Sequence, residues 1–313
     1  MPTLLAIEAL EADRMFVERN LKETPNNPWG TTRLMWQNRL AEIDRLIAET
    51  ARQRSNYASV ALIFDGVPVI GSNDIRLDFA ANALDSYQKI ISLSLAAKLA
   101  EDLPQKGPLP GSDRSRLFIR DLVRGSMGFI LEELAPEQEE MLPSVLKDAV
   151  ENSTNLLSVF SNAADEAFES TLQATQPRLV SAVQKFAKLL YEAGASTRIV
   201  GDENRLSLST DDVGSLSKRL NEVEIVEEIE PAEGVLLGIL PESRQFELRP
   251  LGDDGTIKGT ISEDLALKYT ADAAFKERLL LQPVMAQIKH IKTMRNGRFV
   301  REQRVLEAVE PKL

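Results

Sequence analysis

Carboxylates are the most abundant side chains in this sequence that could perform catalysis or hold a metal. The 313 residues include 48 Asp and Glu, one histidine and no cysteine. Asp65, Asp74 and Asp78 follow one another closely, and their oxygens are suitable ligands for Mg²⁺. Each also has a simpler local role, because we expect Asp65 in a turn, Asp74 as a helix cap and Asp78 in the first helical turn. The sequence therefore favours these local roles, without a metal ion, and a carboxylate–metal hydrolase is the less favoured interpretation.

The single histidine, His290, is of a residue type that can act as a general acid or base near neutral pH. It stands beside Ile288 and Ile291, with no Ser or Asp at a motif spacing, and the chain has no Gly-x-Ser-x-Gly elbow. No phosphate-binding glycine loop is present either. Without cysteine the chain lacks disulfides, thiolate nucleophiles and zinc fingers. We therefore expect an ordinary strand histidine, no catalytic residue and no cofactor.

The most unusual charge pattern lies near the end of the chain. Asn296-Gly297 predicts a two-residue turn between strands 283–295 and 298–309. Residues 289–304 contain six basic residues and one acidic residue, Glu302, although the whole chain has a net charge of −11. The basic residues are Lys289, Lys292, Arg295, Arg298, Arg301 and Arg304. We take them, with Phe299, as the candidate binding residues.

A two-residue turn also predicts which residues of the two strands face each other. The expected pairs are Lys289 with Arg304, Lys292 with Arg301, Thr293 with Val300, Met294 with Phe299, and Arg295 with Arg298. Like charges opposite one another destabilise a hairpin, so negative charge must offset them. The acidic strand 222–230 of the same domain could do this, and so could an anionic partner such as nucleic acid. Base stacking would have to use Phe299.

Apolar spacing predicts a helical hairpin within residues 1–56, built from helices 3–22 and 32–54. Trp29 and Trp36 lie at its turn and at the start of the second helix. They are candidate interface residues, because tryptophan often anchors protein interfaces. They could instead cover the end of the hairpin.

Residues 57–134 predict a ββαββ unit. Its first hairpin joins strands 58–64 and 67–70 at Asp65-Gly66, and Pro68 restricts the second strand to a sheet edge. A helix of about 74–100 follows, and then a second hairpin, 116–134, with its turn at residues 124–126. The apolar residues at 117–119, 122 and 123 would also suit a helix. Helices are expected over 137–193, ending at Gly194.

From residue 196 the pattern changes to short alternating strands. They are expected at 197–200, 204–208, 222–229, 233–240, 244–249 and 256–261, with a short helix near 271–278 before the last hairpin. The fold class is therefore α+β. A helix-rich domain at 1–195 precedes a small antiparallel β domain at 196–313, which resembles a barrel or a sandwich.

These patterns favour a non-catalytic binding or assembly subunit of a cytoplasmic, bacterial multi-protein system. The N-terminal residues lack a secretory signal pattern and no apolar run is long enough to span a bilayer, so we expect a soluble protein with no membrane partner. The expected partner is another protein or a second copy. The alternatives are a nucleic-acid-binding protein that uses the basic hairpin 285–304, and the carboxylate–metal hydrolase.

Overall fold

The structure is a computed structural model of the chain, and it has the α+β fold that the sequence predicts. It describes residues 1–23, 31–52, 55–71, 74–100, 103, 107–123, 127–134, 142–252 and 255–312. No helix in these ranges is both long enough and apolar enough to cross a membrane.

The chain divides into two compact units by its internal contacts. Unit 1 consists of Met1–Leu84, Arg116–Ser158 and Leu190–Val213, and unit 2 consists of Asp85–Ser115, Val159–Leu189 and Gly214–Leu313. The predicted domain boundary near residue 195 stays a prediction.

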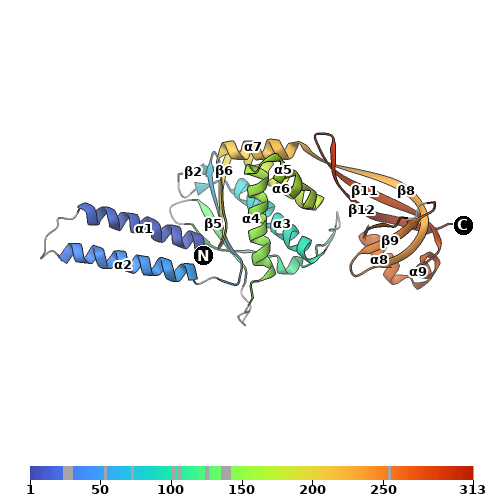
Figure 1. The fold of residues 1–313 in the computed structure, drawn as a ribbon, viewed down its shortest axis with the longest axis horizontal. Coiled ribbons are helices and arrows are strands. Elements are labelled where there is room, and N and C mark those ends of the chain that lie inside the picture. Colours follow the sequence, from blue (N-terminus) through green and yellow to red (C-terminus); the bar gives the residue numbers. More distant parts are fainter. Residues whose placement is uncertain are drawn as a thin grey trace. The chain divides into compact units, whose positions relative to one another are not determined.

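Unit 1 begins with two long helices, α1 (Thr3–Glu23) and α2 (Thr31–Arg52), which lie side by side (Figure 1). Most of their side chains remain wholly or partly exposed, because two helices alone can bury only one stripe each. Val17 of α1 and Ile43 of α2 are buried. Arg14 and Asp44 link the helices with a 2.8 Å ion pair.

An antiparallel sheet forms the centre of unit 1. Its strand order is β4 (Phe118–Leu122), β5 (Gly128–Glu132), β1 (Ser59–Gly66), β6 (Ala195–Val200) and β7 (Arg205–Leu208). The run Ser59–Phe64 is buried, because β1 pairs with β5 on one side and with β6 on the other. Phe64 packs edge-on against Phe79, with their ring centroids 5.3 Å apart. The opposite face of the sheet packs against Leu5 of α1.

A buried ion pair connects α1, α4 (Val145–Asn162) and the loop between β6 and β7. Lys147 Nζ lies 3.1 Å from Asp202 Oδ2, with side-chain exposed fractions of 7% and 2%. Asp202 Oδ1 accepts hydrogen bonds from Thr3 N (2.8 Å) and Thr3 Oγ1 (3.0 Å). Lys147 Nζ also donates to the carbonyl oxygen of Ser55. The start of α1 is therefore held to unit 1 by a carboxylate at its positive end.

The first predicted hairpin differs in its pairing. Strand β2 (Val69–Ile70) pairs with β3 (Asp74–Ile75) in a separate two-stranded sheet, and not with β1. Pro68 has no N–H to donate to a ladder, and Gly66 has a φ of 95°, which turns the chain at the end of β1. Asp74 consequently lies in a strand rather than capping a helix. Helix α3 (Leu77–Leu99) begins three residues later.

The predicted helical region contains α4, α5 (Asp165–Ala174) and α6 (Pro177–Ala193), and Gly194 ends it with a φ of 62°. A further helix, α7 (Thr210–Asn221), forms where the sequence pattern predicts no helix. The second predicted hairpin forms from β4 and β5, and its expected turn at 124–126 lies outside the described residues.

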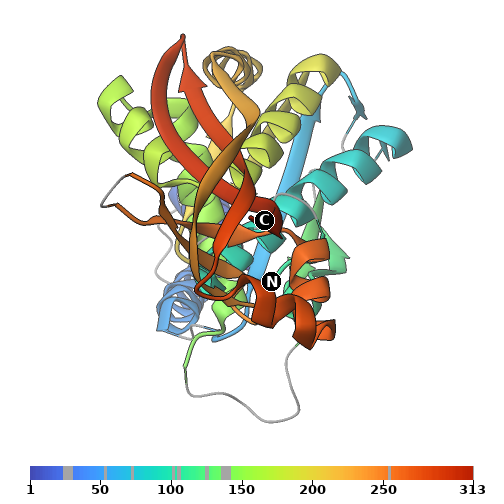
Figure 2. The same cartoon turned by 90° about the vertical axis from the view of Figure 1, so that its right-hand side faces the viewer.

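Five strands of unit 2 pair in a closed ring, in the order β10 (Ile257–Ile261), β12 (Arg298–Pro311), β11 (Pro283–Arg295), β8 (Val223–Leu240) and β9 (Gln245–Pro250). Strands β11 and β12 form a long curved pair (Figure 2). Strand β8 is one continuous strand, where the sequence predicts two, because β11 pairs with its residues 223–235, across the predicted break. An apolar core that includes Leu236, Phe246 and Ile288 is buried in this unit.

Two helices precede the last hairpin, where the sequence predicted one. They are α8 (Glu263–Ala271) and α9 (Ala273–Leu279). Ser262 caps α8 and Asp272 caps α9, each by accepting a hydrogen bond from a backbone N–H in the first turn.

Candidate functional site

The basic hairpin of β11 and β12 has a different register from the predicted one. Arg295 faces Arg298 and Met294 faces Phe299, as expected. A β-bulge then leaves Val300 without an opposite residue, so that Thr293 faces Arg301 and Lys292 faces Glu302. Beyond the bulge, Lys289 faces Val305 and His290 faces Arg304. The predicted pairs of Lys292 with Arg301, Lys289 with Arg304 and Thr293 with Val300 are therefore wrong.

Glutamates neutralise the two lysines of the hairpin. Lys289 Nζ lies 2.6 Å from Glu307 on β12 and 3.7 Å from Glu227 on β8. Lys292 Nζ lies 2.5 Å from Glu228 on β8. Hydrogen bonding to Glu307 outweighs burial and raises the pKa of Lys289 above its ordinary value. Strand β8 therefore supplies the negative charge that the sequence suggested.

Arg295 is buried and surrounded by three carboxylates. Its guanidinium nitrogens lie 3.1 Å from Asp165, 3.2 Å from Glu169 and 3.3 Å from Glu222. The guanidinium also stacks on the ring of Phe168, 4.5 Å from its centroid. Hydrogen bonding to Arg295 holds the pKa of the Asp165 carboxyl below its usual value. Arg295 thus fastens the end of the hairpin to α5.

His290 is held by a carboxylate on the facing strand β12. Its Nδ1 lies 3.0 Å from Glu302 Oε1, and Arg304 lies 2.6 Å from the other oxygen of that carboxylate. Burial raises the pKa of Glu302, but hydrogen bonds from His290 and Arg304 outweigh it, so the pKa lies below its ordinary value. Glu302 therefore remains ionised and holds His290 in place, which is a structural role.

The remaining candidate residues lie toward the turn. Arg301 donates to the carbonyl oxygens of Gln173 and Ala174 at the end of α5, at 3.4 and 3.2 Å. Arg298 and Phe299 are exposed. The structure thus gathers all six basic residues on one hairpin. Five of them form ion pairs or hydrogen bonds within unit 2, namely Lys289, Lys292, Arg295, Arg301 and Arg304. Arg298 and Phe299 remain exposed at the turn of this β-hairpin.

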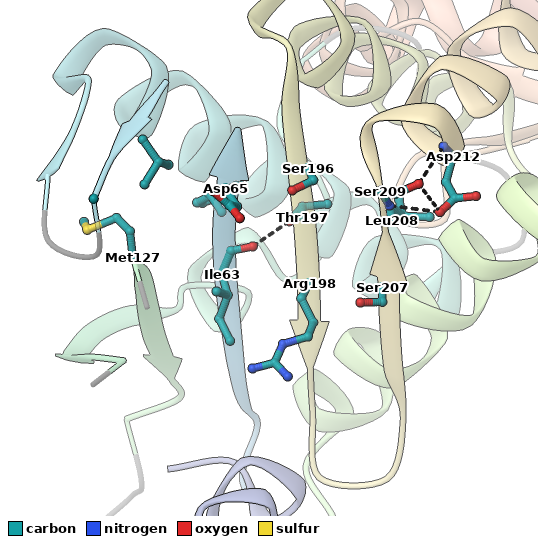
Figure 3. Close-up of a pocket in the computed structure, with 13 residues that line it drawn as sticks. Ile63, Asp65, Met127, Ser196, Thr197, Arg198, Ser207, Leu208, Ser209 and Asp212 are labelled. Carbon is teal, nitrogen blue, oxygen red and sulfur yellow. Dashed lines mark hydrogen bonds between the residues drawn. The ribbon is translucent and has the colours of Figure 1, made fainter. Parts of the chain in front are cut away.

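A second candidate is a cavity of about 580 Å³ in unit 1, drawn in Figure 3. Strands β1, β6 and β7 and the start of α7 line it. Its polar side chains are those of Asp65, Ser196, Thr197, Arg198, Ser207, Ser209 and Asp212.

Local hydrogen bonds explain most of these polar groups. The Ser209 N–H donates to Asp212 Oδ2 at 2.9 Å, and the Asp212 N–H donates to Ser209 Oγ at 3.2 Å (Figure 3). This reciprocal pair is a capping box at the start of α7. Hydrogen bonding from Ser209 lowers the pKa of Asp212, which makes the carboxylate a poor general base near neutral pH. Arg198 is paired with Glu8 at 3.0 Å.

The three carboxylates considered as metal ligands do not form a metal site. Asp65 accepts a hydrogen bond from the N–H of Gly66 at 2.7 Å, and Asp78 pairs with Arg76 at 2.7 Å. In the part of the chain that the structure describes, no group of three or more His, Cys, Asp or Glu side chains could hold a metal ion.

The helices α1 and α2 carry several large apolar side chains that remain exposed. Met15, Phe16, Leu34 and Met35 have exposed fractions of 64%, 58%, 58% and 55%. Trp36 is half-buried against Phe16, with ring centroids 6.3 Å apart, and the other candidate, Trp29, lies outside the described residues. We call Met15, Phe16, Leu34, Met35 and Trp36 the hairpin patch. Comparison of the chain with family models, curated proteins and solved structures gives no match.

Proposed function

We propose that this chain is a non-catalytic assembly subunit of a cytoplasmic system, and that it pairs with a second copy of itself through the hairpin patch. The carrying observation is the exposure of four large apolar side chains on neighbouring helices. Large apolar side chains that stay exposed together on a folded protein often mark interaction sites. Its burial contributes roughly 25 cal/mol for each Å² of apolar area.

A second pair of helices could pack on α1 and α2 and bury their exposed apolar side chains. Each helix of the hairpin has few fully buried residues, so its remaining apolar stripe is available for a further layer. Four-helix bundles bury such stripes by stacking one helical pair on another. A two-fold contact between identical patches supplies that layer without a different protein.

The charges next to the hairpin patch favour an identical partner. They include both signs, because Arg14 pairs with Asp44 and Arg39 lies 3.9 Å from Asp13. A second copy brings the same mixture of charges. An arginine next to the patch of one copy could then pair with an aspartate next to the patch of the other. A partner with only negative charge, such as nucleic acid, would be repelled by the carboxylates of Asp13 and Asp44.

The other sites support this proposal by what their residues already do. His290, Arg295 and Asp212 are held in structural interactions, which leaves them poorly suited to act on a substrate. The nucleic-acid alternative depends on Arg298 and Phe299 at the turn between β11 and β12.

We also infer that the closed ring of β8–β12 is a small barrel, since its pairing closes on itself around a buried apolar core.

Sedimentation equilibrium of the full chain tests the proposal. We expect a dimer for the native sequence and a monomer for the double variant Met15→Glu, Met35→Glu. The dissociation constant should rise at least a hundredfold, because four apolar side chains lose their cover in each dimer. Both residues are more than half exposed, so the variant should fold normally, as checked by circular dichroism.

Leu267→Glu in α8 is the matched control, because Leu267 is 64% exposed and lies outside the hairpin patch. It should leave the dimer intact. A monomeric native protein, or a dimer that persists in the double variant, would overturn the proposal. Salt-dependent binding of DNA that Arg298→Glu abolishes, in a protein that remains monomeric, would favour the nucleic-acid alternative instead.

A further inference from the structure

A cavity in unit 2, separate from the surfaces described above, has the features of a ligand site. Its volume is about 470 Å³, within the range of small-molecule sites. The end of α3, the segment 108–110, the turn between β8 and β9, and strand β10 line it. The lining residues are Leu99, Ala100, Pro108, Leu109, Pro110, Glu242, Ser243, Arg244, Gln245 and Thr260.

Two polar side chains of this cavity have unmet hydrogen-bonding capacity. Thr260 is 2% exposed, and its Oγ1 has no hydrogen-bond partner among the described residues. The buried Nη1 of Arg244 likewise has no partner there. Most buried polar atoms in native proteins are paired, so two orphans at one cavity call for a specific explanation.

Arg244 is held only weakly by its surroundings. Its Nη2 lies 4.0 Å from Glu263 Oε1, a long ion pair. The residue has a φ of 54°, an unusual backbone conformation for a side chain other than glycine. The backbone carbonyl of Arg244 accepts a 2.8 Å hydrogen bond from Ile261, which fixes this turn beside Thr260. A small rotation of the guanidinium can therefore present Nη1 to the cavity without breaking a short ion pair.

We propose that this cavity binds a small organic monocarboxylate with an apolar body. A guanidinium and a hydroxyl that line the same cavity can donate to the two oxygens of one carboxylate. The wall formed by Leu99, Leu109 and Pro110 suits an apolar chain. Glu242 lines the cavity and Glu263 lies near Arg244, so the site favours a single negative charge over the double charge of a phosphate monoester.

Calorimetric titration of the full chain with octanoate tests this inference. We expect saturable binding of octanoate, and much weaker binding of octanol and of octyl phosphate. Arg244→Gln should weaken octanoate binding about ten- to a hundredfold, because it removes a charge-assisted hydrogen bond. Thr260→Val keeps the shape of the side chain and should weaken binding about fivefold.

Arg249→Gln is the matched control, because Arg249 is an exposed arginine on β9 that does not line the cavity. It should bind octanoate like the native protein. No heat with octanoate at millimolar concentration, or equal binding of octanol, would overturn the inference. So would an unchanged affinity in Arg244→Gln, provided that circular dichroism shows the variant to be folded. The oligomeric state does not enter this test, so it is independent of the proposed dimer.

Discussion

Lys147→Met should destabilise unit 1 by about 3 kcal/mol. The substitution removes the ammonium group from a buried pair and leaves the carboxylate of Asp202 behind, 3.1 Å from where the Lys147 nitrogen stood. Both side chains are almost fully enclosed, so water cannot reach the Asp202 carboxylate to solvate it. Methionine fills a similar volume and leaves no large cavity.

The magnitude follows from what Asp202 retains. Breaking a buried ion pair by removal of one partner typically costs about 3–5 kcal/mol. Asp202 keeps the two hydrogen bonds from Thr3 and its place at the start of α1. We therefore expect the lower end of that range. The double variant Lys147→Met, Asp202→Asn should recover part of the loss, because no charge is then left buried without a partner.

Hydrogen exchange read by mass spectrometry locates the effect. Three kcal/mol corresponds to about a hundredfold loss of protection, and we expect it in the peptides that contain α1, the start of α4 and the β6–β7 loop. Lys185→Met, at an exposed position of α6, is the control and should change nothing. A loss below about 1 kcal/mol would refute the reasoning, because it would place the pair in the energetic range of exposed ion pairs.

Two further predictions concern stability. Burial raises the pKa of Glu151 above its ordinary value of 4.5, against backbone hydrogen bonds that lower it, so the native chain should lose stability as pH rises from 4.5 through that raised pKa. Urea unfolding at a series of pH values should show that Glu151→Gln lacks this loss of stability. The variant should have a higher free energy of unfolding than the native chain at neutral pH, but not at acid pH. The same pH dependence in both proteins would contradict this prediction. Gly259→Ala should cost about 2 kcal/mol, because its Cβ would lie 2.3 Å from the carbonyl oxygen of Arg304 on β12. Gly238→Ala is its control, since nothing lies within 4 Å of the added carbon, and equal unfolding midpoints for the two variants would contradict the prediction.

Elements with regular local patterns could be predicted from the sequence. The last hairpin shows this best, because alternation and Asn296-Gly297 place strand 283–295 as the structure has it. Helix α7 is not predicted because Gly214, Ser215 and Ser217 lower its helix propensity. A signal was nevertheless present, since Ser209 and Asp212 have the spacing of a capping box.

Features that depend on distant parts of the chain could not be predicted. The bulge at Val300 is invisible in a single strand, yet it decides which residue faces Lys292. The carboxylates around Arg295 come from α5 and from Glu222, which directly precedes β8, and α5 is far away in the sequence. The cavity beside Arg244 likewise requires a loop after α3 and a strand near residue 260. The pairing of β1 with β6 belongs to the same class.

That pairing has a consequence for synthesis on the ribosome. Strand β1 emerges early, but its partner β6 is made more than a hundred residues later. At about 5–20 residues per second, the wait is on the order of ten seconds. During this time the apolar residues of β1 can pair only with β5, and one long side of the strand stays open to other nascent chains. Biogenesis of this protein should therefore depend on holding chaperones until the second half of the sequence has been translated.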